Sequence, residues 1–191
     1  MLRNKLSILL TERGIKATKV SNDTGIARST LSKITNNASE KIDYGTINTL
    51  CRYLKITPCD FFEYVPFDVD FFVSIEEGSI YSPEEGLPTF KVEAFLNVDD
   101  ADGKHSIEYE GFLESYGPAS QNTDAIGLYI EPSSANDVID IDMYLSDVSQ
   151  TFITDITQKF KNELAKAVED FGFKSHDKDF ITINLFDKKT K

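Results

Sequence analysis

Apolar side chains recur every three or four positions through the N-terminal third of the chain, a spacing that predicts short amphipathic helices. The first predicted helix covers Leu2–Arg13 and ends at Gly14, where a left-handed stop residue is expected. Two further helices are predicted at Ala17–Thr24 and Arg28–Thr35. Gly25 lies between them, where a sharp turn needs a residue that tolerates positive φ.

Two more helices are predicted before Pro66. Asp43 suits the N-cap of the fourth helix, which has apolar residues at the i, i+3, i+4 and i+7 positions of one stripe. Thr57 suits the N-cap of the fifth, short helix, and Pro58 suits its first position. Residues 1–66 are therefore predicted to form an all-α bundle of five helices. The stripe of the fourth helix consists of Ile47, Leu50, Cys51 and Leu54.

The pattern changes at Val65-Pro66, beyond which Phe and β-branched residues alternate with polar residues, as in half-buried strands. The Asp and Gly chemistry of Asp99–Lys104 predicts a hairpin turn. A long amphipathic helix is predicted over Asp147–Phe171, and a last strand over Phe180–Phe186. This order predicts an α+β domain over residues 67–191, with a mostly antiparallel sheet and one long helix on one sheet face. The other predicted strands are Val69–Ser74, Thr89–Val98, His105–Ser115, Ala125–Glu131 and Val138–Leu145.

The segment Gly14–Asn36 carries the clearest functional signal. It is predicted to contain two short helices joined by a tight turn, and the second helix presents polar and basic residues outward. Helix-turn-helix proteins offer side chains to the DNA major groove in this way. The alternative is that Arg28 and Lys33 are ordinary solvated residues on a bundle that binds only protein.

Core, turn and cap positions agree with one another over residues 2–64. They are Gly14-Ile15, Val20-Ser21, Gly25-Ile26, the run Arg28-Ser29-Thr30-Leu31-Ser32-Lys33-Ile34, and Ile47, Leu50, Cys51, Leu54, Thr57, Pro58, Asp60, Phe61 and Phe62. This combination resembles the Cro/C1-repressor-like (XRE) helix-turn-helix family. The resemblance covers about a third of the chain. No family resemblance is found in the remainder.

The resemblance implies that the helix Arg28–Thr35 enters the major groove of double-stranded DNA. Arg28 and Lys33 then suit the O6 and N7 atoms of guanine. Lys16 and Lys19 are placed to contact phosphates. The full set of implied DNA-binding positions is Lys16, Ala17, Lys19, Arg28, Ser29, Thr30, Ser32, Lys33, Asn36 and Asn37.

Two positions depart from the pattern of the family. Ala17 stands where many members have a Gln that braces base contacts. Ala27 stands where a Ser usually caps the recognition helix, so a weak cap is expected. Neither departure changes the expected fold.

Charge divides the chain at the same place as the apolar pattern. The net charge is −12, yet residues 1–66 hold 10 Lys and Arg against 6 Asp and Glu, a net charge of +4. Residues 67–191 hold 10 Lys and Arg against 26 Asp and Glu, a net charge of −16. A basic N-terminal part suits DNA, and the acidic part is expected to point away from the duplex. The alternative is that the acidity only maintains solubility.

No metal site is expected. Val98–Gly103 has part of the spacing of a calcium loop, but Val98 and Tyr109 occupy ligand positions where oxygen-bearing acidic side chains are needed, so a simple turn is favoured. Asp140 and Asp142 share one face of a predicted strand, and a solvated face is favoured over a cation site.

Histidines and cysteines show no ligand pattern either. His105 and His176 have no Cys or second His at zinc-ligand spacing. Cys51 falls on a buried stripe, and a buried position is also favoured for Cys59 over a redox-sensing role near a helix N-terminus. No disulfide framework, nucleophile motif or phosphate-binding loop is found. We therefore expect neither enzymatic activity nor a cofactor.

These observations favour a sequence-specific transcriptional regulator, expected to be a repressor that binds an inverted repeat as a homodimer. The acidic domain is the expected place for the dimer contact or for signal input from a small-molecule or protein effector. The alternative is a protein-interaction module, such as an antitoxin or antirepressor, whose acidic domain binds a partner protein. A third hypothesis, an enzyme fused to a DNA-binding head, has no catalytic motif to support it. The start of the chain is neither a signal peptide nor a membrane span, so a cytoplasmic location is expected.

Overall fold

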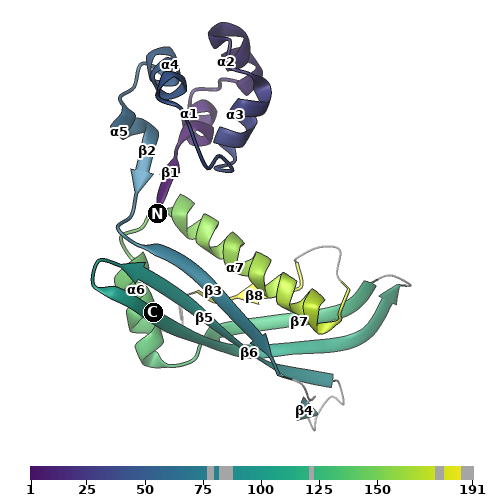
Figure 1. Ribbon diagram of the computed structural model, residues 1–191. Helices are drawn as coiled ribbons and strands as arrows, with labels where there is room; N and C mark the ends of the chain where they lie inside the picture. Colours follow the sequence, from purple (N-terminus) through teal and green to yellow (C-terminus); the bar gives the residue numbers. More distant parts are fainter. Residues whose placement is uncertain (77–79, 82–87, 121–122, 175–178, 186–191) are drawn as a thin grey trace. The chain divides into compact units, whose positions relative to one another are not determined.

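The structure is a computed structural model that describes residues 1–76, 80–81, 88–120, 123–174 and 179–185. The chain divides into two compact units, Met1–Pro66 and Phe67–Lys191 (Figure 1). Each unit has its own core of buried apolar side chains.

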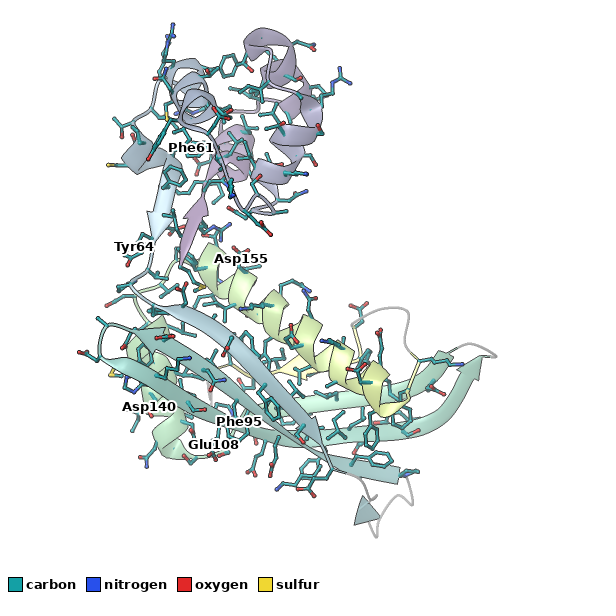
Figure 2. The ribbon with its side chains drawn as sticks, viewed as in Figure 1. Phe61, Tyr64, Phe95, Glu108, Asp140 and Asp155 are labelled. Carbon is teal, nitrogen blue, oxygen red and sulfur yellow. The ribbon has the colours of Figure 1, made fainter. Side chains whose placement is uncertain are left out.

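The first unit is built mainly from short helices around one apolar core. Its largest fully buried side chains include Leu6, Leu31, Leu50 and Phe61, and Figure 2 labels Phe61 among the helices. The helices are α1 (Leu6–Glu12), α2 (Ala17–Thr24), α3 (Arg28–Thr35), α4 (Tyr44–Leu54) and α5 (Pro58–Phe61). The second and third have the bounds that the sequence predicts.

A small sheet corrects the prediction of an all-α bundle. The strands β1 (Leu2–Asn4) and β2 (Phe62–Tyr64) pair antiparallel, with Arg3 opposite Glu63. The first predicted helix is therefore wrong over its first residues, and α1 begins only at Leu6. Pairing between segments so far apart in sequence outweighs the helical spacing of the leucines, and this long-range effect leaves no local signal.

Local caps fix the later helices as expected. Asp43 caps α4 by accepting a hydrogen bond from the Thr46 N–H at 2.8 Å. At α5 a capping box is present, in which the Thr57 hydroxyl accepts from the Asp60 N–H and the Asp60 carboxylate accepts from the Thr57 N–H. Pro58 occupies the first turn, where its missing N–H costs nothing.

The second unit contains a mixed but mostly antiparallel sheet with the strand order β3-β5-β6-β7-β8, and β4 pairs with β5. Only the pairing of β7 with β8 is parallel among the described strands. The prediction of a mostly antiparallel sheet is therefore confirmed. The strands are β3 (Asp68–Ile75), β4 (Ile80–Tyr81), β5 (Pro88–Asp100), β6 (Gly103–Ser120), β7 (Thr123–Pro132) and β8 (Ile181–Ile183).

The β5–β6 hairpin has the tight turn that the sequence predicts. Asp100 pairs with Gly103, and one carboxylate oxygen of Asp100 accepts the N–H groups of Asp102 and Gly103 at 2.8 and 3.1 Å. These bonds, led by the one from Asp102, outweigh desolvation and lower the pKa of Asp100. Asp100 thus serves the turn itself, which agrees with a simple turn rather than a calcium loop.

The long helix α7 (Gln150–Phe171) lies along one face of the sheet (Figure 1). Phe160 stacks on Phe71 of β3 at 4.5 Å and meets Tyr109 of β6 edge-on at 5.2 Å between ring centroids. The helix ends at Gly172, which has a φ of 117°. The apolar stripe expected from the helical spacing is Phe152, Ile156, Phe160, Leu164, Val168 and Phe171. All of these residues are buried except Phe171, which is half-buried at the end of the helix.

A second helix, α6 (Ala135–Leu145), corrects the predicted strand Val138–Leu145. The alternation of apolar and acidic residues suggests a strand, but Ser134 caps a helix by accepting from the Asp137 N–H. Residues two positions apart in a helix point about 200° from each other. Asp140 and Asp142 therefore do not share one face, and that basis for a cation site is wrong. The domain has two described helices instead of one.

Candidate nucleic-acid interface

The turn between α2 and α3 is held by hydrogen bonds from both sides. Gly25 has a φ of 75° and donates its N–H to the Ser21 carbonyl at 3.0 Å. The Ser21 hydroxyl donates to the Ile26 carbonyl at 2.7 Å. Thr24 donates its hydroxyl to the Val20 carbonyl at 2.6 Å, and the Ile26 N–H donates to that hydroxyl at 3.3 Å. This set of bonds fixes the direction in which α3 leaves α2.

The inner sides of the two helices anchor them in the core. Val20 of α2 and Leu31 and Ile34 of α3 are fully buried. The predicted DNA-binding residues lie on the outer sides of the two helices or just beyond their ends, and they are exposed except for the half-buried Ala17. The exposed set is Lys16, Lys19, Arg28, Ser29, Thr30, Ser32, Lys33, Asn36 and Asn37.

Asn4 is a site residue that the sequence analysis does not identify. Its side chain is buried and donates to the Ile34 carbonyl at 2.8 Å and to the Asn37 amide oxygen at 2.6 Å. The amide oxygen of Asn4 accepts the Leu6 N–H at 3.0 Å. Asn4 therefore joins β1, the start of α1 and the C-terminal end of α3. Its only sequence signal is a polar residue within an otherwise leucine-rich segment.

Asn37 completes this network from the other side. Its φ is 50°, a left-handed conformation that Asn tolerates. Its amide oxygen also accepts the Asn4 N–H at 2.9 Å, and its amide nitrogen donates to the Asn4 carbonyl at 3.2 Å. These bonds join Asn37 to β1 and help to position the end of α3, while one N–H of its exposed amide has no bond among the described residues and Asn37 stays a predicted DNA-binding residue.

Lys19 has a partner within the domain. Its ammonium lies 2.8 Å from the Asp23 carboxylate, which also accepts the Tyr53 hydroxyl at 2.7 Å. The hydrogen bond with Asp23 raises the pKa of Lys19, and the bonds from Lys19 and Tyr53 lower the pKa of Asp23. Both groups stay charged near neutral pH, so an arriving phosphate would compete with Asp23 for Lys19.

The N-terminal end of α3 has no side-chain cap, because Ala27 offers no acceptor. The expectation of a weak cap is therefore confirmed. The first N–H groups of a helix have no partner within the helix, and its N-terminus carries a partial positive charge. Together with the exposed Arg28 and Ser29, this end of α3 suits an anionic ligand such as a phosphate.

The two cysteines differ in whether they are buried as the sequence predicts. Cys51 is buried as predicted, but Cys59 is exposed, so its predicted buried position is wrong. In the short helix α5 the inward position belongs to Phe61 instead. Among the described residues no group of three or more His, Cys, Asp and Glu side chains could hold a metal ion.

His176 lies outside the described residues. No helix in the described parts of the chain is long and apolar enough to cross a membrane.

Comparison with known proteins identifies the first unit. Residues 5–66 match the family model of the Cro/C1-type HTH DNA-binding domain, which confirms the resemblance stated from the sequence. The match supports a DNA-binding regulator and covers about a third of the chain. No similar sequence was found among curated proteins, and no similar structure among solved ones.

Proposed function

We propose that the chain is a sequence-specific transcriptional repressor that inserts α3 into the major groove of an operator. The observation that carries this proposal is the hydrogen-bonded turn between α2 and α3, which presents Arg28 and Lys33 outward within the matched domain. In this arrangement Arg28 and Lys33 bind guanine edges. Lys16 and the N-terminus of α3 bind phosphates and set the register.

We further propose that the protein acts as a dimer. One helix-turn-helix unit reads only a few base pairs, so useful specificity normally needs two units on a two-fold site. The unit Phe67–Lys191 has a core of its own. In this proposal its surface provides the dimer contact and the binding site for the signal. It acts without catalysis in this proposal. Repression then follows from occupancy of the operator, which blocks polymerase.

Selection of bound sequences from a random duplex pool tests this proposal. The full-length protein is used at near-physiological salt, because the affinity for DNA depends strongly on salt. We expect recovery of an inverted repeat with half-sites about one helical turn apart. A single short site would contradict the dimer but not the DNA-binding unit. No enrichment by folded protein would contradict the proposal and favour a protein-interaction module.

A further inference from the structure

The sheet of the second unit has an outer face, defined here as the face away from α7. Cross-strand pairing places Phe72, Phe95 and Glu108 side by side on it, and Figure 2 labels Phe95 and Glu108 on this side of the sheet. Phe72 is 59% exposed, and two further aromatic residues on the outer face, Phe112 and Tyr129, are 50% and 44% exposed. Exposed aromatic residues that gather on one face commonly mark a binding surface.

One end of this face is hollowed into a shallow groove of about 320 Å³ that is open to solvent. It lies over β6, β7 and β8. We call it the aromatic groove. Its principal lining residues are Phe112, Glu114, Tyr116, Gly127, Tyr129 and Phe180.

The register of β6 and β7 forms this groove. Phe112 lies opposite Tyr129, and the next pair on the same face is Glu114 opposite Gly127. Gly127 has no side chain, and a Cβ there would lie 3.4 Å from the Tyr116 ring. The Tyr116 ring thus covers the backbone of Gly127, while Phe112 and Tyr129 provide aromatic surface beside it.

A carboxylate lies at the hydroxyl end of two of the aromatic rings, Glu114 within the groove and Glu131 beside it. The Tyr116 hydroxyl donates to Glu114 at 2.5 Å, and the Tyr129 hydroxyl donates to Glu131 at 2.6 Å. Each bond orients a ring and keeps a negative charge at its edge. Among the described residues, Lys91 of β5 pairs with Phe112 of β6, and its ammonium lies 2.6 Å from the Glu93 carboxylate. The negative charge of Glu114 and Glu131 is therefore not balanced by Lys91.

We propose that the aromatic groove binds a small organic cation, a substituted ammonium or guanidinium on an apolar frame. Aromatic faces attract such cations through their quadrupole, and a nearby carboxylate adds direct attraction. A hydrated metal ion would gain little from the rings, and an anion would be repelled. A second copy of the same acidic face would place carboxylates against carboxylates, so charge complementarity selects a cationic ligand.

The aromatic groove is then the site at which the second unit receives its signal, and this role rests on the proposed function. The binding itself can be measured without DNA. A failure to bind an organic cation would therefore leave DNA binding untouched, and a failure in the duplex selection would leave the groove untouched.

Titration of the full-length protein with choline, followed by amide NMR, tests the inference. The control ligand is the neutral carbon isostere of choline, in which a tert-butyl group replaces the trimethylammonium group. We expect saturable shifts at Phe112, Tyr116, Gly127 and Tyr129 with choline, and binding of the isostere weaker by about tenfold. Equal binding of both ligands, or choline shifts confined to other parts of the chain, would overturn the inference.

Two matched variants test the residues of the groove. Glu114→Gln should weaken choline binding several-fold, whereas Glu108→Gln removes the same charge from the same face outside the groove and should leave binding unchanged. Gly127→Val should block the groove without changing any charge, and the amide spectrum of each variant reports whether it folds. Equal loss in both Gln variants would mean that only the overall charge matters, which overturns the site. If a trimethyllysine peptide bound more than about tenfold more tightly than choline, the ligand would be a modified protein segment, which would overturn the proposal of a small molecule.

Discussion

At the scale of single residues, Lys16 and Lys19 separate general attraction for DNA from base recognition. Both are exposed near the N-terminal end of α2. We predict that Lys16→Ala and Lys19→Ala each weaken binding to all duplexes alike. Each should also lower the slope of log affinity against log salt by about 0.9, the effect of one lost phosphate contact.

Binding measured over a series of salt concentrations checks this prediction. Arg52→Ala removes one exposed positive charge from α4 and serves as the control, with an unchanged slope. Lysine variants that lose affinity for one sequence only would contradict the assignment to phosphates.

Asn4 gives a second prediction at this scale. Its buried amide satisfies the Ile34 carbonyl and binds Asn37, so Asn4→Ala leaves buried polar groups unpaired. The expected loss of unfolding free energy is about 1–3 kcal/mol. Urea titration, followed at the amide signals of Leu31 and Ile34, measures it.

The neighbouring exposed residue provides the control for Asn4. Asn36→Ala should change the unfolding free energy by less than about 0.5 kcal/mol. If Asn4→Ala were equally mild, the network between Asn4 and Asn37 would not position α3.

At the scale of elements, the missing cap of α3 can be supplied. We predict that Ala27→Ser stabilises α3 by about 1 kcal/mol, because a serine hydroxyl at the N-cap can accept an N–H group of the first turn. Hydrogen exchange of the α3 amides measures the gain. Ala38→Ser, at an exposed position beyond α3, should give none. If both variants protected the α3 amides from hydrogen exchange equally, the N–H groups of the first turn of α3 would already have partners, contrary to the prediction.

The cap of α4 makes stability depend on pH. Hydrogen bonds from Thr46, led by its side chain, outweigh desolvation and lower the pKa of Asp43. Because the pKa of Asp43 is lower in the folded state, the ionised carboxylate stabilises the fold at pH values above the pKa of Asp in the unfolded chain, about 3.9. This stability is lost as the pH falls through the pKa of Asp43 in the folded state. The side chain of Asn can still accept the capping hydrogen bond, but it does not titrate. We therefore predict that Asp43→Asn reduces the loss of α4 stability between about pH 6 and about pH 3.

The urea midpoint of α4 amide signals, measured from about pH 6 to about pH 3, checks this effect. Glu40→Gln removes an exposed carboxylate elsewhere in the first unit and controls for overall charge. An Asp43→Asn protein with the same acid dependence as the parent would rule out the proposed cap effect.

Elements whose local signals agree with one another could be predicted from the sequence, and elements with conflicting local signals or set by distant contacts could not. The bounds of α2 and α3 follow from Gly25 and the apolar spacing, both of which are local. The strand β1 depends on pairing with β2, which the spacing of the leucines does not reveal. The helix α6 has a local cap at Ser134, but the alternation of apolar and acidic residues conceals it.

The candidate sites were predictable to different degrees for the same reason. The outward residues of α3 follow from helical spacing alone. The aromatic groove requires the register of β6 against β7 and the parallel strand β8, which places Phe180 beside residues about fifty positions earlier in the chain. No local pattern specifies such a register.

At the scale of the whole molecule, charge separates the two units. The first 66 residues carry a net charge of +4 and the remainder −16. Because DNA phosphates repel the acidic unit, specific contacts are expected from the basic unit alone. We expect the acidic unit to lower non-specific binding, and the proposed role of its aromatic groove is to bind a cationic signal.

The most direct test of the central claim is to repeat the duplex selection with Arg28→Ala and Lys33→Ala beside the parent protein and Arg52→Ala. We predict that each α3 variant binds the parent operator more weakly by about 1–3 kcal/mol and loses base preference at a defined position in each half-site. Arg52→Ala should recover the parent motif. Recovery of the full parent motif at parental affinity by both α3 variants would contradict the claim that α3 reads the operator.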